Sequence, residues 1–500
     1  MFLGIDIGTG SSKAVLVDRD GEIIDSAVVA HAVSLPKPGW AEFDAEEVWW
    51  AEVGLLSREL FSRNDAVDVA GVCVSGVGPA LVVTDENHTP LRPAILYGID
   101  TRAGAEIDEL NHEIGEEVIF AECGKALSSQ AVGPKLRWIS NHEPEVFEKT
   151  ARWFGCSSFI VAKLSGAYVQ DHHTASQCDP LYDIRAGEWN EPRVKEIAGH
   201  IPMPRLAWSS DVVGEVTAQA AEFTGIPQGT PVCAGTVDAW AESFSAGIRK
   251  PGDLMLMYGS TLFFVLMLSE FRASDKLWTT AGIEKDSLTL AAGMSTSGSL
   301  TTWMQQLFGG VEFAELLAEA GEVPAGSEGL LVLPYFAGER SPIFDPDARG
   351  VIAGLTLRHS RGHLFRATYE GIAFGIRQII DFLEAGGEPI ERLVAVGGGT
   401  QARLWTQIVS DVTGRPQMVP TQTIGASYGD ALLAAIGTGA VPPDTNWATD
   451  GTLIEPDQRN KEIYAELYGH YESLYPSTRE HMHALARVQG RPKIQDSPEA

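Results

Sequence analysis

Short apolar runs alternate with amphipathic segments along most of the chain. The apolar runs predict strands at residues 2–7, 13–18, 69–75, 80–84, 254–258, 262–268 and 392–396. Apolar positions with helical spacing predict helices at residues 45–60, 300–308, 362–385 and 404–414. Strands that alternate with helices are typical of an α/β protein, which is the fold class we expect.

One residue breaks the apolar pattern of the first predicted strand. In MFLGIDIGTGSSKAVLVD, Asp6 interrupts a run of Phe, Leu and Ile residues. A carboxylate on a buried strand costs free energy unless another group compensates its charge. We therefore expect either a partner that neutralises Asp6 or a position at the mouth of a cleft that holds a cation or a polar ligand.

The pattern around Asp6 recurs in the middle of the chain. Residues 2–18 (FLGIDIGTGSSKAVLVD) and 253–268 (DLMLMYGSTLFFVLML) share the order strand, glycine-containing turn, strand. The chain is 500 residues long, more than one hydrophobic core usually organises. We therefore predict duplicated domains that face each other, at residues 1–248 and 249–487, with a flexible polar tail at 488–500.

The first turn, GTGSSK (8–13), has neither the spacing of a P-loop nor a following helix, which argues against P-loop and Rossmann sites. Its backbone N–H groups and the hydroxyls of Thr9, Ser11 and Ser12 could still bind phosphate. The alternative is a plain hairpin whose glycines adopt positive φ. The second copy of the turn, at 259–261, shifts the balance toward a nucleotide held between the domains.

Two further motifs follow apolar strands. Gly397–Gly399 would allow a flat ligand or its ribose to approach the backbone, or would serve tight packing of a strand against a helix. Asp238 comes after the apolar segment that ends at Ala234. It could cap a helix or lie in its first turn, but ligands in open α/β sheets bind beyond the carboxyl ends of strands.

Charge and cysteine content narrow the classes of partner. The net charge is −30 and no stretch is dense in Lys or Arg, which argues against nucleic acid or an anionic membrane as the main partner. The five cysteines lack CxxC spacing, so neither a disulfide framework nor a zinc site is expected. We see no leader-like or membrane-spanning run and expect a cytoplasmic protein.

Several longer motifs occur in a fixed order between these features. They are GWAEFDAEEVWW (39–50), YGIDTRA (97–103), PKLRWI (134–139), DIRAGEW (183–189), GTVDAWAESFSAG (235–247), MYGST (257–261), LPYFAGERSPIFDPDARGVIAGL (333–355) and VGGGTQARLWTQIVSDVTGRP (396–416). Together with the first turn, they resemble the FGGY family of carbohydrate kinases over residues 2–475. The resemblance implies two ribonuclease H-like, actin-like ATPase domains around a central cleft, the first binding sugar and the second ATP.

The resemblance also implies roles for particular residues. Asp238 would be the general base for the sugar hydroxyl, and Asp6 and Asp238 would hold Mg²⁺. ATP would be contacted by Gly8, Thr9, Gly10, Ser11, Gly259, Ser260, Thr261, Gly298, Gly397, Gly398 and Gly399. The sugar would be contacted by Gly78, Pro79, Asp100, Arg102, Asp238 and Ala239.

The sequence departs from the family pattern on the sugar side. SGVGPA (75–80) replaces S-G-Q-M-H-G, Ala239 replaces a common Asn or Gln, and YGIDTRA is one residue longer than W-N-D-G-R. A ketopentose such as D-xylulose, yielding the 5-phosphate, is the first expectation. Another ketose, a glycerol- or erythritol-like polyol and a modified sugar are alternatives. An actin-like ATPase and a catalytically silent sugar sensor are rivals, and a homodimer is one option for the assembly.

Structural roles compete at four places. Asp100 and Arg102 could form a surface ion pair instead of a sugar contact. The 40–44 segment is expected to be structural, with Asp44 capping a helix. His172 and His173 are expected in a polar loop rather than at a metal. Glu339 and Arg340 could lie near the cleft or form a structural ion pair.

Overall fold

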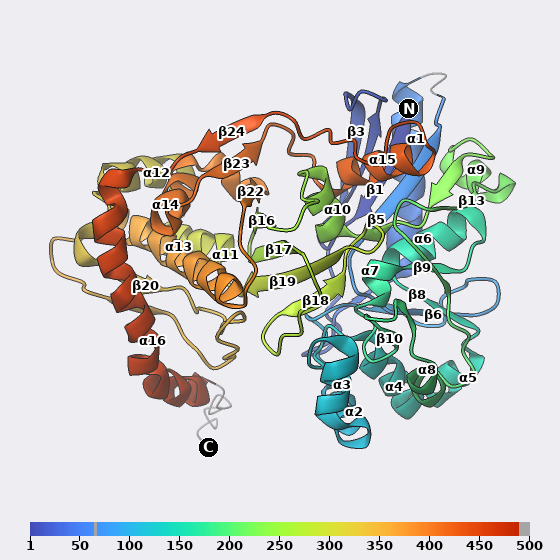
Figure 1. Ribbon diagram of the computed structural model, residues 1–500, viewed down its shortest axis with the longest axis horizontal. Coiled ribbons are helices and arrows are strands. Elements are labelled where there is room, and N and C mark those ends of the chain that lie inside the picture. Colours follow the sequence, from blue (N-terminus) through green and yellow to red (C-terminus); the bar gives the residue numbers. More distant parts are fainter. Residues whose placement is uncertain (65–67, 490–500) are drawn as a thin grey trace, which may run out of the picture. The chain divides into compact units, whose positions relative to one another are not determined.

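The computed structural model describes residues 1–64 and 68–489, which form two compact units (Figure 1). Unit 1 comprises Met1–Pro251, Val265–Leu290 and Gln422–Asp450, and unit 2 comprises Gly252–Phe264, Ala291–Thr421 and Gly451–Ala500. The chain thus leaves unit 1 within RKPGD and returns to it twice. Of the predicted tail, residues 488 and 489 end the last helix and the rest lies outside the described residues.

Unit 1 is built on a mixed sheet with the order β13-β14-β5-β1-β2-β3, and β15 pairs with β5 beside this path. The strands are β1 Phe2–Ile7, β2 Ser11–Val17, β3 Ile23–Ala30, β5 Gly71–Gly76, β13 Val212–Glu215, β14 Pro231–Cys233 and β15 Thr236–Val237. The first strand is antiparallel to β2 and parallel to β5, and β14 and β15 are also parallel to β5. Their carboxyl ends therefore point to one edge.

The second large sheet repeats this order as β24-β23-β22-β16-β17-β19-β18. Its strands are β16 Asp253–Tyr258, β17 Leu262–Leu268, β18 Trp278–Ala281, β19 Leu288–Met294, β22 Arg392–Val396, β23 Gln417–Pro420 and β24 Gly451–Ile454. As in the first sheet, the strand that precedes the turn has a parallel neighbour, and the last strand is an antiparallel edge. The predicted duplication and the α/β class are confirmed.

The helices match the apolar periodicity of the sequence. Those nearest the two sheets are α1 Ala51–Arg63, α6 Cys156–Ser165, α10 Asp238–Ser245, α11 Gly298–Leu307, α13 Arg361–Ala385, α14 Arg403–Thr413, α15 Ala426–Gly437 and α16 Lys461–Gln489. A π-helical turn, Ala45–Trp50, precedes α1. As predicted, Asp44 caps it by accepting the N–H groups of Glu46 and Glu47.

Shorter elements fill the segments between these. The strands are β4 Glu42–Phe43, β6 Val82–Thr84, β7 Ala94–Ile95, β8 Arg152–Phe154, β9 Val169–Asp171, β10 Tyr182–Asp183, β11 Glu188–Trp189, β12 Arg205–Ala207, β20 Leu331–Leu333 and β21 Val351–Ala353. The helices are α2 Gly104–Leu110, α3 Glu116–Cys123, α4 Val132–His142, α5 Pro144–Lys149, α7 His172–Ala175, α8 Glu191–Ile197, α9 Ala218–Thr224 and α12 Phe313–Glu322. Most of them belong to the long insertion between β5 and β14.

The close packing of α15 against β1 explains the glycine at position 4. A Cβ atom on Gly4 would lie 1.9 Å from the Ser427 carbonyl oxygen, so only glycine allows α15 to approach the strand.

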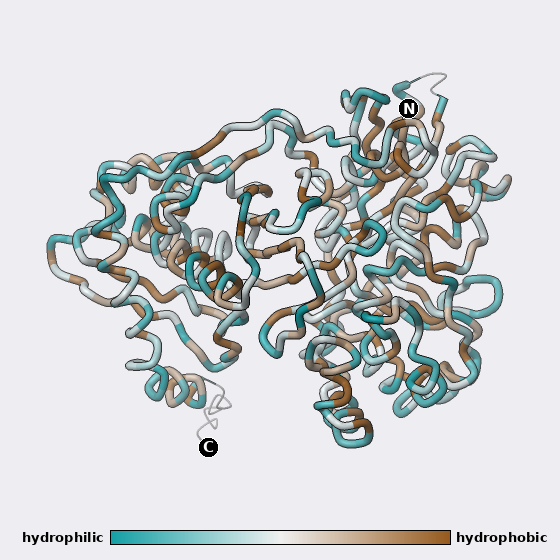
Figure 2. The backbone as a smooth tube through the Cα atoms, viewed as in Figure 1, coloured by the Kyte–Doolittle hydropathy of each residue, from teal (hydrophilic) through white to brown (hydrophobic). Residues whose placement is uncertain are grey.

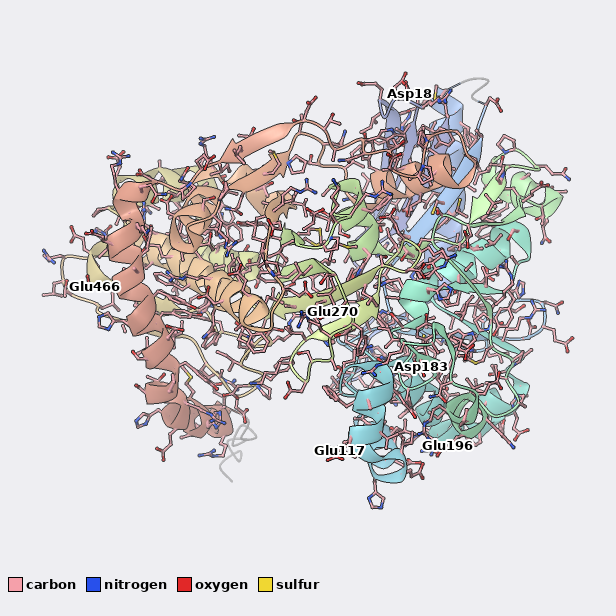
Figure 3. The ribbon with its side chains drawn as sticks, viewed as in Figure 1. Asp18, Glu117, Asp183, Glu196, Glu270 and Glu466 are labelled. Carbon is pink, nitrogen blue, oxygen red and sulfur yellow. The ribbon has the colours of Figure 1, made fainter. Side chains whose placement is uncertain are left out.

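Hydrophobic segments run along the central strands (Figure 2), whereas acids such as Glu117, Glu196 and Glu466 point away from the ribbon and are exposed (Figure 3). None of the described helices is both long and apolar enough to cross a membrane.

Candidate active site

The two acids singled out in the sequence lie at the same edge of the unit 1 sheet. Asp6 is opposite Ser75 in the register of β1 with β5, and Thr236 of β15 is opposite the same Ser75. Asp238 follows β15 directly and is the first residue of α10. The parallel strands thus bring together two residues that are far apart in the sequence.

Asp6 is buried, and its Oδ1 has no hydrogen-bond partner among the described residues. Burial raises the pKa of this carboxyl group well above its usual value, and the negative charges of Asp238 and Asp430 raise it further. Lys13 opposes the shift. A buried, unpartnered carboxylate among like charges is suited to a cation, as the expectation for Asp6 required.

Asp238 is half-buried, and its Oδ1 accepts the backbone N–H of Ala239 at 2.7 Å. Burial raises its pKa to about 7, and the charge of Glu242 adds to the shift, while the Ala239 N–H opposes it. The helix cap is Val237, so the structure supports a first-turn position rather than a cap. A carboxyl group that titrates near neutral pH can accept a proton from an alcohol during a reaction.

Two further acids belong to this cluster and were not singled out in the sequence. Asp430 of α15 is fully buried, and its Oδ2 accepts the Ser75 hydroxyl at 2.6 Å and the Ser75 N–H at 3.1 Å. Glu242 lies one helical turn after Asp238 on α10. The sequence signals were the spacing of four residues in DAWAE and a single acid among the small residues of GASYGDALLAA.

The carboxylates can contribute to a Mg²⁺ site but do not enclose one. Mg²⁺ prefers oxygen ligands and retains several waters, so one or two carboxylates suffice when a phosphate completes the shell. Within residues 1–64 and 68–489, no group of three or more His, Cys, Asp or Glu side chains is arranged to hold a metal ion. The unpartnered Oδ1 of Asp6 is the oxygen best placed to be a ligand.

The first turn has both bonded and unbonded backbone N–H groups. The N–H of Gly8 bonds to the Ser11 carbonyl at 3.1 Å, and the carbonyls of Gly8 and Gly10 both contact His31. The N–H groups of Thr9 and Gly10 have no partner in the described part of the chain. Neither glycine has positive φ, and a Cβ atom on Gly10 would meet nothing within 4 Å. The positive φ that the plain-hairpin alternative assumed for these glycines is therefore absent at Gly8 and Gly10.

The second turn shows the same orientation with a different support. The Gly259 N–H bonds to the Thr261 carbonyl at 3.1 Å. The carbonyl of Gly259 accepts the N–H of Gly298, and that of Ser260 accepts the N–H groups at the start of α11, at 3.0–3.1 Å. The N–H groups of Ser260 and Thr261 have no partner among the residues that the structure describes.

Packing accounts for three of the glycines expected along the nucleoside. A Cβ atom on Gly298 would lie 2.6 Å from the Gly259 carbonyl oxygen, so α11 can reach the turn only with glycine there. Gly397 has φ of 89° and would clash with the Tyr258 carbonyl, and Gly399 would clash with Trp405. Gly398 alone has open space.

The loop at Glu339 and Arg340 supports the strand that leads to α11. Ser341 donates its N–H to the Gly293 carbonyl at 3.0 Å, Arg340 donates to the Met294 carbonyl at 2.8 Å, and Glu339 accepts the N–H of Ser295 at 2.8 Å. Burial raises the pKa of Glu339 to about 7. The loop thus supports this strand through hydrogen bonds to its backbone.

Two of the expected sugar-side residues lie at the edge that carries Asp6. Gly78 and Pro79 follow β5, and the N–H of Val77 bonds to the Ile7 carbonyl at 2.7 Å. A Cβ atom on Gly78 would lie 2.7 Å from Val237, the residue before Asp238. This segment is therefore beside the predicted base, although neither residue offers a side-chain hydrogen bond.

Asp100 and Arg102 form a buried network, so the alternative of a surface ion pair is wrong. Arg102 contacts Asp100 at 2.6 Å and Glu42 at 2.8 Å, and its guanidinium group lies 3.8 Å from the centre of the Trp40 ring. Both carboxylate oxygens of Asp100 accept hydrogen bonds within this network, one of them from the Ala41 N–H. The network confirms that the 40–44 segment is structural.

His172 and His173 lie in the short helix α7, so the predicted polar loop is wrong. His173 is fully buried, and its Nδ1 lies 2.7 Å from the Ala281 carbonyl oxygen. Burial lowers the pKa of His173 to about 3. Burial, the Ala281 carbonyl at Nδ1 and the Gln177 amide 2.8 Å from Nε2 give this histidine a structural role.

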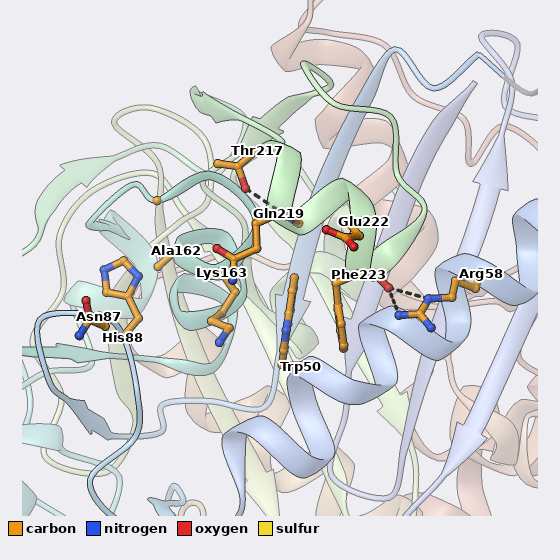
Figure 4. A pocket seen from close by; sticks show the side chains of 12 residues that line it. Trp50, Arg58, Asn87, His88, Ala162, Lys163, Thr217, Gln219, Glu222 and Phe223 are labelled. Carbon is orange, nitrogen blue, oxygen red and sulfur yellow. Dashed lines mark hydrogen bonds between the residues drawn. The ribbon is translucent and has the colours of Figure 1, made fainter.

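A separate cavity of about 490 Å³ lies on unit 1 (Figure 4). The rings of Trp50 and Phe223 stack there at 4.8 Å, and Arg58 donates to the Phe223 carbonyl. None of the predicted site residues lines it. On unit 1, the candidate active site is therefore defined by the acids and the first turn rather than by this cavity.

Comparisons with known proteins agree with the fold and the motifs. The family model "FGGY family of carbohydrate kinases, N-terminal domain" matches residues 1–245, and the C-terminal domain model of the same family matches residues 254–438. The crystal structure of a xylulose kinase from Rhodospirillum rubrum is similar, with 33% identity and a TM-score of 0.88, over 96% of this chain and 99% of that chain.

Curated relatives span nearly the whole chain. The xylulose kinase of Bacillus subtilis is 29% identical over 96% of this chain and 97% of its own length. The glycerol kinase of Nocardia farcinica is also 29% identical, over 90% of this chain and 93% of its own length. Both halves of the chain match the two domain models in order. The chain belongs to the FGGY family of carbohydrate kinases.

Proposed function

We propose that this protein transfers the γ-phosphoryl group of ATP to a hydroxyl group of a small sugar, with D-xylulose, phosphorylated at O5, as the first candidate. The observation that carries the proposal is the placement of Asp6 and Asp238 at the carboxyl ends of parallel strands. The turn that follows β1 also leaves two backbone N–H groups unbonded. Relatives that are named xylulose kinases support the choice of sugar.

The chemistry assigned to Asp238 is proton transfer. Its carboxylate would accept the proton of the attacking hydroxyl, and a pKa of about 7 makes it a stronger base than an ordinary carboxylate while leaving much of it ionised at neutral pH. Asp6 and Asp238 would hold Mg²⁺, and that ion, when bound, would neutralise charge on the phosphates.

The two turns are assigned to phosphate binding. In each turn, two unbonded N–H groups, those of Thr9 and Gly10 or of Ser260 and Thr261, would donate to phosphate oxygens. The open space at Gly10 allows close approach of a ligand to the backbone. We assign the nucleoside to the open face of Gly398, with Gly397, Gly399 and Gly298 shaping that backbone.

A second candidate is a kinase for another ketose, a polyol or a modified sugar. Gly78, Pro79 and Ala239 provide no side-chain hydrogen bonds to hydroxyl groups. The polar atoms of Asp100 and Arg102 bond to each other and to Glu42. A site that reads fewer hydroxyl groups through side chains discriminates less between related sugars.

The experiment is a coupled assay of ADP release over ketopentoses, aldopentoses, polyols and glycerol. We expect release that depends on the sugar, and a loss of about 10²-fold or more in Asp238→Ala, the usual size of a general-base effect. Glu117→Ala, at an exposed acid of α3, is the control and should match the parent.

Three other outcomes would contradict the proposal. An Asp238→Ala variant within threefold of the parent would remove the base assignment. Equal ATP hydrolysis with and without every acceptor would favour an actin-like ATPase. Sugar binding without turnover would favour a silent sensor.

The partner we propose is thus a small sugar or polyol. The net charge of −30 argues against nucleic acid and anionic membranes. A cytoplasmic location and a homodimer stay predictions. Light scattering during size-exclusion chromatography would test the dimer.

A further inference from the structure

A buried pair of side chains, His31 and Glu52, lies directly against the first turn and has no counterpart in the motifs of the sequence. The Nε2 atom of His31 is 3.0 Å from the Gly8 carbonyl oxygen, and its Nδ1 atom is 2.9 Å from Oε2 of Glu52. The same Oε2 accepts the Ser12 hydroxyl at 2.5 Å. The side chains of His31 and Glu52 are only 7% and 9% exposed.

The partners of His31 define where its protons lie. A backbone carbonyl and a carboxylate are both acceptors, and a neutral imidazole can donate from only one nitrogen. Both contacts are satisfied when the ring donates from Nε2 to Gly8 while a proton lies between Nδ1 and Glu52.

The pair controls which way the turn faces. The backbone N–H of His31 also bonds to the Gly10 carbonyl at 3.1 Å, so two carbonyls of the turn point at one residue. The N–H groups of Thr9 and Gly10 remain unbonded within the described residues. The Gly8 carbonyl shares its peptide unit with the Thr9 N–H, so holding that carbonyl on one side presents the Thr9 N–H to the other side.

We propose that His31, held by Glu52, is a positioning residue that orients the first turn for binding of the nucleotide phosphates. This inference rests on the proposed kinase function, because it assigns phosphate to the N–H groups of Thr9 and Gly10. His31 itself does not touch the substrate. It holds the Gly8 carbonyl, and Glu52 keeps its ring in the state that can do so.

The test combines calorimetric binding of MgADP with KM values for ATP and for the best sugar. His31→Ala should raise the Kd for MgADP and the KM for ATP about tenfold, because the turn loses a charge-assisted hydrogen bond, and leave the KM for sugar within twofold. His31→Gln, whose amide N–H can reach the Gly8 carbonyl, should stay within threefold of the parent in all three.

Two more variants sharpen the test. Glu52→Ala removes the group that faces Nδ1 and leaves the ring without its support, so its KM for ATP should lie between those of the parent and His31→Ala. His200→Ala is the matched control, because His200 Nε2 also lies 3.0 Å from a backbone carbonyl, that of Thr150, in the same unit. Its three constants should equal those of the parent.

Each contrary result has a defined meaning. A folded His31→Ala with the Kd of the parent, or with both KM values raised equally, overturns the role of His31. A His31→Gln as weak as His31→Ala does the same, since the donor to Gly8 would then not matter. If thermal unfolding shows that His31→Ala does not fold, the KM values of His31→Gln and Glu52→Ala for ATP decide between the outcomes. A parent that does not bind MgADP contradicts the kinase function and this inference together.

Discussion

The turns after β1 and β16 are two copies of one backbone arrangement with different chemistry around them. Both have a glycine, both leave two N–H groups unbonded among the described residues, and both sit between equivalent strands. Two residues before the turn glycine, however, the first copy has Asp6 and the second has Met257. The unbonded N–H groups that we assign to phosphate are thus common to both copies, whereas the acid two residues before the turn belongs to one copy only.

The groups that hold the carbonyls of the two turns also differ. The carbonyls of the first turn are held by a histidine side chain and backbone, and those of the second by the N–H groups that begin α11. Glu339 in turn holds the Ser295 N–H just before that helix. The unbonded N–H groups are thus supported by a histidine in one copy and by backbone donors in the other, and the bond from the glycine N–H reaches Ser11 in the first turn but Thr261, only two residues on, in the second.

The largest expected effect is on kcat, at the position where the two copies carry different residues, Asp6 and Met257. Asp6→Asn should lower kcat by about 10²-fold or more, because a carboxylate assigned to Mg²⁺ is lost. Met257→Leu, at the equivalent position, should stay within twofold of the parent. The midpoint temperature of thermal unfolding should not fall in Asp6→Asn, because the substitution removes a buried negative charge beside Asp238 and Asp430.

Rates measured at saturating Mg²⁺ check this prediction. An Asp6→Asn variant with kcat within threefold of the parent would mean that the two copies are chemically equivalent. The comparison would then have to be abandoned.

The next effect is the dependence of the reaction on pH. The pKa of Asp238 is raised to about 7, so the base is protonated at lower pH and kcat/KM for the sugar should fall tenfold per pH unit below about 7. The pKa of Glu339 is also raised to about 7. The pH profile of kcat/KM in Glu339→Gln shows which of the two groups is responsible. If it is Asp238, this variant should keep the slope of the parent. A slope that disappears in Glu339→Gln would assign the titration to the second copy.

A smaller effect tests the support of the second turn. Glu339→Ala should raise the KM for ATP about fivefold, because the strand leading into α11 loses the acceptor of the Ser295 N–H. Glu339→Gln keeps an oxygen acceptor and should change the KM less than twofold. Initial rates over a range of ATP concentrations provide the measurement. Equal changes in the KM values for ATP and sugar would argue against a local role.

The last prediction compares two glycines, Gly298 and Gly10, by their effect on stability rather than on activity. Gly298→Ala should lower the free energy of unfolding by about 1–3 kcal/mol, because the added methyl group would clash with the Gly259 carbonyl. Gly10→Ala should change it by less than about 0.5 kcal/mol, since nothing lies within 4 Å. Urea denaturation measures both. A strongly destabilised Gly10→Ala would mean that the open space at the first turn has another cause.

Local pattern was enough to predict the duplicated hairpins, the α/β class and the positions of Asp6 and Asp238. These features depend on residues that are close in the sequence and on the rule that parallel strands end at one edge. The cap formed by Asp44 was predictable for the same reason. The assignments of individual residues to ATP, Mg²⁺ and sugar stay predictions.

Tertiary structure decided which groups surround those acids and turns. Asp430 reaches Ser75 only because α15 returns to unit 1 near the end of the chain, and Glu52 reaches His31 only because α1 packs beside β2 and β3. The buried network of Asp100 and Arg102 and the helix that contains His173 were missed as well. A charge acts on its neighbours through space, and those neighbours are set by chain crossings that no local pattern records.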